Sequence, residues 1–211
     1  MPRRSATLDA GTDRSIPANR KVDVVTRIVG LAAVVFSGLY LLSDVIETVQ
    51  GGFSVPQLIL TLVAEAAVPF FVVGLYIVAR PRIGRLGLIS AIGYAYSYVF
   101  FTGTVVYVLV NGTSDYPALT AELGASMTIH GAIMVVAGIG FGLAVIRAGV
   151  LPPWTGVALA VGVIAVAATQ AAPEVVRLVA AGIRAVAFGG MGISLMSGRW
   201  AARRGGTGPT R

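Results

Sequence analysis

Six apolar runs, each about as long as a helix that crosses a lipid bilayer, constrain this chain more than any other feature. They cover residues 27–49, 56–79, 84–110, 119–146, 153–171 and 173–197. A helix rises about 1.5 Å per residue and the hydrocarbon core is about 30 Å thick, so roughly 20 helical residues span it. We therefore predict an all-α fold, a polytopic transmembrane helical bundle of six spans.

The composition agrees with lipid as the surroundings. Only 12% of the 211 residues are charged and 56% are hydrophobic, whereas soluble domains carry about 25% charge. A soluble protein with six such runs and short turns between them would have almost no polar surface. The chain has no cysteine and one histidine, which excludes thiolate chemistry, cysteine-ligated metals and any site that needs two imidazoles.

The positions of the basic residues predict the orientation. Of the 16 Lys and Arg residues, 14 lie in residues 1–27, the 80–85 turn, the turn at Arg147 and the C-terminal segment. The loops on the other side carry none, and cytoplasmic loops are enriched in Lys and Arg. We expect both termini to be cytoplasmic, with a disordered basic arm (1–21), a transmembrane domain (22–200) and a basic tail (201–211).

The net charge of +7 follows from this topology. It indicates attraction to anionic lipid, and it does not indicate nucleic-acid binding, because no aromatic residues alternate with the basic ones. The preference for Arg over Lys, with abundant Ala, Gly and Val, is typical of a GC-rich bacterial genome. We therefore expect a multi-pass protein of a bacterial cell membrane.

Two stretches carry a resemblance to known proteins. Residues 141–157 read FGLAVIRAGVLPPWTGV and residues 100–107 read FFTGTVVY. Over residues 22–200 the chain resembles small, uncharacterised six-helix membrane proteins of actinobacterial type. The shared motifs are structural, so the resemblance implies a six-helix layout and no particular activity.

The candidate functional residues are the ionisable ones inside the apolar runs. A charge at the bilayer centre costs at least about 2.5–3.5 kcal/mol, so each must face protein or water. Counting residues from the helix ends places all of these ionisable residues in the extracytoplasmic half of the membrane. They predict a polar cavity, open or nearly open to that face, lined by Asp44, Glu47, Glu65, Glu122, His130, Arg177 and Arg184.

Three of these residues have alternative roles. Glu65 and Arg184 enter the membrane to similar depths, so we expect them to form a buried ion pair, either as scaffold or as part of a site. His130 is either a packed imidazole or the group that exchanges protons, because its pKa lies near neutrality. An enzymatic role stays open but is less favoured, since Ser194 and His130 are expected at different depths, which argues against a nucleophile–base pair.

Two functions fit this pattern. The first is a membrane protein that binds or transports a small polar or cationic solute in the outward-facing cavity, with proton coupling through His130. The second is a structural or accessory subunit that meets a membrane-protein partner or a second copy of itself. The sequence indicates no cofactor, and carboxylates with one imidazole do not specify a metal.

Overall fold

The computed structural model describes residues 16–198, and side chains from Val24 onward. Within this part the chain forms seven helices and no strand. The helices are α1 (Ile16–Gln50), α2 (Val55–Ala79), α3 (Gly84–Asn111), α4 (Tyr116–Leu123), α5 (Ala125–Ala148), α6 (Pro153–Ala168) and α7 (Glu174–Met196). The predicted all-α fold is confirmed.

Five of the helices are long and apolar enough to cross a membrane, namely α2, α3, α5, α7 and the Val24–Gln50 part of α1. The sixth long element, α6, is apolar but has only 16 residues. Large apolar side chains cover the outside of the bundle, and Phe70, Ile89 and Val110 are 80%, 70% and 78% exposed. These features describe a multi-pass helical membrane bundle.

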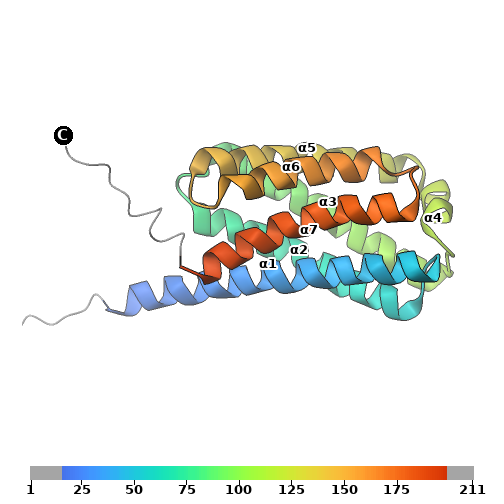
Figure 1. The fold of residues 1–211 in the computed structure, drawn as a ribbon, viewed down its shortest axis with the longest axis horizontal. Helices are drawn as coiled ribbons and strands as arrows, with labels where there is room; N and C mark the ends of the chain where they lie inside the picture. Colours follow the sequence, from blue (N-terminus) through green and yellow to red (C-terminus); the bar gives the residue numbers. More distant parts are fainter. Residues whose placement is uncertain (1–15, 199–211) are drawn as a thin grey trace, which may run out of the picture.

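The six long helices form a closed ring. Each packs mainly on two neighbours, in the order α1, α2, α3, α5, α6, α7, and α7 returns to pack on α1. Figure 1 shows them running side by side, with the short α4 at one end of the bundle. That end also holds the end of α1 and the starts of α2 and α7, and we call it the α4 end.

The predicted span 119–146 is wrong as a single helix, because Gly124 divides it into α4 and α5. Gly124 has φ +50° and ψ −125°, a backbone conformation that glycine adopts far more readily than other residues. Asp115 caps α4 by accepting a hydrogen bond from the Ala118 amide at 2.9 Å. The chain therefore folds across the end of the bundle before α5 enters it.

The N-terminal boundary also differs from the expectation. α1 begins at Ile16, so residues 16–21, which we assigned to the disordered arm, are helical. Residues 1–15 and the basic tail 201–211 lie outside the described residues. The other predicted spans agree with α2, α3, α6 and α7 to within a few residues.

Glycines hold the helices together at the end opposite α4. A Cβ on Gly30 of α1 would lie 2.8 Å from the carbonyl oxygen of Gly192 of α7. In the same way, a Cβ on Gly142 of α5 would lie 2.5 Å from the carbonyl oxygen of Gly156 of α6. Small residues let helix backbones approach closely in lipid, so the bundle is tight here and the free space lies towards α4.

Candidate functional site

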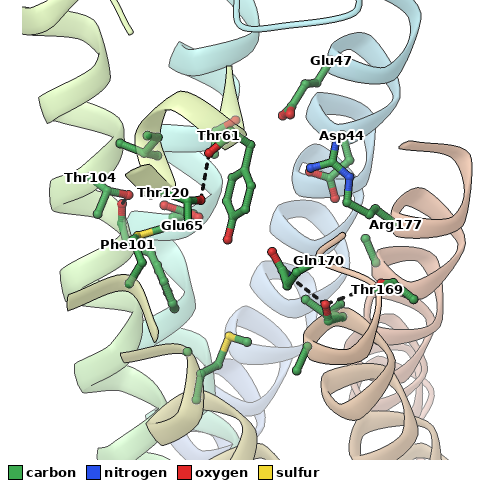
Figure 2. A pocket seen from close by; sticks show the side chains of 18 of the residues that line it. Asp44, Glu47, Thr61, Glu65, Phe101, Thr104, Thr120, Thr169, Gln170 and Arg177 are labelled. Carbon is green, nitrogen blue, oxygen red and sulfur yellow. Dashed lines mark hydrogen bonds between the residues drawn. The ribbon is translucent and has the colours of Figure 1, made fainter. Parts of the chain in front are cut away.

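A cavity of about 1020 Å³ occupies the α4 end of the bundle, and all seven helices contribute residues to its wall. Figure 2 shows Asp44, Glu47 and Arg177 facing Thr104 and Thr120 across this space. Most ligand cavities measure about 300–1,000 Å³. The cavity is therefore large enough for an organic molecule of moderate size.

The charged wall residues come from one side of the ring. They belong to α1, α2 and α7, which are consecutive in the ring, while α3, α4, α5 and α6 contribute none. We call the α7–α1–α2 side the charged half. Its charged members are Asp44, Glu47, Glu65, Glu174, Arg177 and Arg184.

Tyr40 of α1 joins the two most deeply buried charged residues of the cavity. Its hydroxyl donates a hydrogen bond to Glu65 Oε1 at 3.0 Å. The guanidinium carbon of Arg184 lies 4.5 Å from the centre of the Tyr40 ring and 5.9 Å from that of Tyr98. Glu65 and Arg184 are only 5% and 7% exposed. We call Tyr40, Glu65 and Arg184 the Tyr40 cluster.

The predicted ion pair between Glu65 and Arg184 is absent. Arg177 forms an ion pair with Glu174 at 3.6 Å, and neither Glu65 nor Arg184 forms one with another residue whose side chain is described. The reason lies in the ring order: α1 stands between α2 and α7, and the Tyr40 side chain from α1 contacts both charged residues. The sequence placed these residues at similar depths but could not show which helix separates them.

Both charges of the Tyr40 cluster keep unused hydrogen-bonding capacity. Glu65 Oε2 is buried and has no hydrogen-bond partner. The guanidinium of Arg184 has five N–H donors, and the neighbouring hydroxyl groups of Tyr40 and Tyr94 are too few to occupy all of them. Pro69, inside α2, has no N–H with which to bond the carbonyl of Glu65 four residues earlier. The floor of the cavity can therefore accept hydrogen bonds from a ligand and donate others to it.

A network of neutral side chains connects α1 and α2 above this floor. The Gln57 side-chain amide donates to Ser43 Oγ at 3.2 Å, to Thr61 Oγ1 at 3.1 Å and to Glu47 Oε2 at 3.3 Å. Ser43 and Thr61 also hydrogen bond to each other. Gln57 is 1% exposed and its Oε1 is unpartnered. This network fixes the carboxylate of Glu47 at the wall.

Arg177 and Glu174 lie at the start of α7, nearer the mouth. The Arg177 guanidinium carbon is 5.7 Å from the centre of the Tyr116 ring on α4. Burial raises the pKa of the Tyr116 phenol above its usual value. Arg177 also interacts electrostatically with Asp44. Because Arg177 and Glu174 neutralise each other, the charged half retains three carboxylates and one guanidinium, an acidic excess.

Glu122 and His130, which we predicted to line the cavity, do not. Glu122 is exposed on α4 and accepts a hydrogen bond from Thr113 Oγ1 at 3.0 Å. His130 stacks on Phe100 of α3, with ring centres 3.7 Å apart. The His130 side chain points towards α3 because α5 begins anew after Gly124, and this new start sets the rotation of α5 about its axis.

The hydrogen bonds of His130 define its tautomer. Nδ1 lies 2.8 Å from the carbonyl oxygen of Ser126 and must be the donor, because a carbonyl only accepts. In the neutral ring Nε2 then accepts from the Tyr96 hydroxyl at 3.1 Å. Both ring nitrogens of His130 thus have hydrogen-bond partners at the contact between α3 and α5, which is the arrangement expected of a packed imidazole.

Sequence reasoning missed Tyr40 and Gln57. Tyr40 lies four residues before Asp44, and residues four apart share a helix face, so the spacing was a usable signal. Gln57 is the polar residue that follows Pro56 in an apolar run. Tyrosine and glutamine side chains are both uncharged near neutral pH, and the candidate set contained only Asp, Glu, His and Arg residues. In the part of the chain with described side chains, no three His, Asp or Glu residues are grouped as metal ligands would be.

Comparisons with known proteins add no assignment. The chain matches no protein-family model, no curated protein and no solved structure. The resemblance to small actinobacterial membrane proteins therefore stays a prediction. Functional conclusions rest on the cavity and on the residues that form it.

Proposed function

We propose that this chain crosses the membrane six times, with both termini in the cytoplasm, and that it binds a small polar or cationic solute in a cavity open to the extracytoplasmic side. The proposed orientation rests on the distribution of Lys and Arg. The α4 end carries the loops without basic residues. The sixth span is α6, whose 16 residues extend about 24 Å at 1.5 Å per residue.

The observation that carries the proposal is the buried, incompletely satisfied charge at the cavity floor. Burying an ionised group is unfavourable unless it is paired and hydrogen bonded. Glu65 has one unpartnered oxygen, and Arg184 has no ion-pair partner among the described residues. A cationic solute beside Glu65 would pair with this buried, unpaired charge, and the acidic excess of the charged half favours such a solute over a neutral or anionic one.

Proton exchange on binding falls to Asp44 and Glu65 in this proposal. Both line the cavity, whereas His130 faces α3 and is satisfied by Ser126 and Tyr96. A cation entering beside these carboxylates competes directly with a proton. Binding of a cationic solute should therefore weaken as the pH falls.

Ligand-induced stabilisation tests the proposal. A ligand that binds the folded state alone raises the free energy of unfolding, so tetramethylammonium should raise the melting temperature of the purified protein in a saturable manner. Glu65→Gln should abolish the effect, while Glu122→Gln, at an exposed residue outside the cavity, should preserve it. The accessory-subunit alternative predicts no shift with tetramethylammonium and stoichiometric co-purification with another membrane protein.

A further inference from the structure

The cavity wall formed by α3, α4, α5 and α6, which we call the neutral half, differs from the charged half in its side chains and in its exposure to the outside of the bundle. The neutral half contains Phe101, Val105, Met127 and Met134. The cavity is thus two-sided, with acid groups on α1 and α2 and, opposite them, mainly apolar side chains with a few threonines such as Thr104 and Thr120. A small, fully polar ion would leave this apolar wall unused.

Val136 shows that the cavity continues past the side of α5. Met127 and Met134 are seven residues apart, so they share the inner face of α5, and both are buried. At about 100° per residue, Val136 lies about 200° around the helix from Met134, on the outer face. Val136 is 72% exposed and still borders the cavity. The space therefore reaches the outer surface of the ring.

The opening lies between α5 and α6. On α6, Val163 packs against Gly138 of α5, where an added Cβ would lie 2.7 Å from Val163 Cγ1. Ala167, four residues further along α6 and on the same face, is exposed and borders the cavity. The two helices are thus in contact up to Gly138 and Val163. Beyond this contact, towards the α4 end, their facing sides border the cavity.

The inner edge of this opening lies at the level of the Tyr40 cluster. Val136 is 11 residues from the start of α5 and Arg184 is 10 residues from the start of α7, which gives about 16 Å and 15 Å along the two helices. In the ring, α5 and α6 lie opposite α1 and α2. A molecule whose charged group reaches Glu65 therefore points its other end at the opening.

The geometry points to an amphipathic organic cation as the ligand, one that enters sideways from the bilayer through the opening between α5 and α6. Its cationic group lies among Asp44, Glu65 and the ring of Tyr98. Its apolar part packs against the neutral half and extends between Val136 and Ala167 into lipid. Each methylene moved from water to an apolar surface strengthens binding by about fourfold, so affinity should follow chain length.

The test compares two trimethylammonium ions in lipid nanodiscs, tetramethylammonium and octyltrimethylammonium, both radiolabelled and corrected for uptake by protein-free discs. We expect the octyl compound to bind more than about tenfold tighter, the gain of two buried methylenes. Val136→Trp fills the opening and should slow association of the octyl compound at least about tenfold, leaving that of tetramethylammonium within about twofold. Val136→Ala should not slow either compound. The matched control is Val106→Trp, at a 45% exposed residue of α3 that does not border the cavity.

The outcomes separate this inference from the function on which it rests. Equal affinity for the two ions would overturn the amphipathic ligand and leave cation binding intact. Equal effects of Val136→Trp on both compounds, or no effect on either, would overturn the lateral route. If neither ion binds to the unmodified protein, the proposed function itself fails, and this inference with it.

Discussion

Replacing Tyr40 by phenylalanine would remove one oxygen atom from the centre of the charged half. The Tyr40 hydroxyl is the single hydrogen-bond donor to the Glu65 carboxylate among the described residues, at 3.0 Å. Glu65 is 5% exposed and its other oxygen already lacks a partner. Tyr40→Phe therefore leaves a buried carboxylate with no donor, while the ring that packs on Arg184 remains.

The expected loss of stability follows from these contacts. A hydrogen bond to a charged group contributes about 1.5–3 kcal/mol, and a buried group left without a partner costs its full desolvation. We expect Tyr40→Phe to lower the free energy of unfolding by about 2–3 kcal/mol. Tyr96→Phe is the matched control, because the same substitution there removes a bond to a neutral ring at a 53% exposed residue. Its expected cost is about 1 kcal/mol or less.

Unfolding in mixed micelles of dodecyl maltoside and sodium dodecyl sulfate, followed by circular dichroism, measures both free energies. A double-mutant cycle of Tyr40→Phe with Glu65→Gln should give a larger coupling energy than the cycle of Glu65→Gln with Arg184→Met, because only the first pair is hydrogen bonded. Equal costs for Tyr40→Phe and Tyr96→Phe, or a larger coupling in the second cycle, would refute the arrangement of the Tyr40 cluster.

Three further predictions concern packing, the break after α4, and topology. Gly142→Leu should destabilise the protein by about 1–3 kcal/mol, since the added side chain collides with α6. Gly103→Leu, where the structure has open space, should have no such effect. Unfolding in the same mixed micelles measures the free energies of both variants. Gly124→Ala should cost about 1–3 kcal/mol because alanine disfavours its positive φ, and an unchanged melting temperature would contradict this. A cytoplasm-specific reporter should be active when fused at Arg211 and silent at Ser114; the reverse pattern would exclude the proposed orientation.

The extent of most helices followed directly from the sequence. Apolar length and the polar turns set the ends of α2, α3 and α7 to within a few residues, because charged residues such as Arg80 are costly in lipid. The break at Gly124 was missed because apolar residues flank it on both sides. The start of α4 did have signals, because Asp115 can cap a helix and Pro117 suits a first helical turn, whereas Gly124 was the only signal of the break itself.

The site was less predictable because its geometry depends on how the helices are arranged around the ring. Counting residues gives depth, and it correctly placed Glu65 and Arg184 at similar levels. It does not give the rotation of a helix or its neighbours, so it could not show that His130 faces α3. It also could not show that Tyr40 lies between Glu65 and Arg184, since that depends on the contact of α7 with α1.

The two glycine contacts at the end opposite α4 determine how the cavity can exchange its contents. At Gly30–Gly192 and at Gly142–Gly156 the helices approach so closely that an added Cβ would lie within 2.8 Å of the facing carbonyl oxygen, so rotating a side chain would not by itself open a passage at these contacts. Opening a passage there would require whole helices to separate. The close contacts between their backbones would then be lost to lipid, which packs less tightly against them. The tight end thus serves as a fixed base, and the easier exchange of molecules is through the α4 end and the side between α5 and α6. Under the proposed function, a ligand would then enter and leave the cavity on the same side of this base.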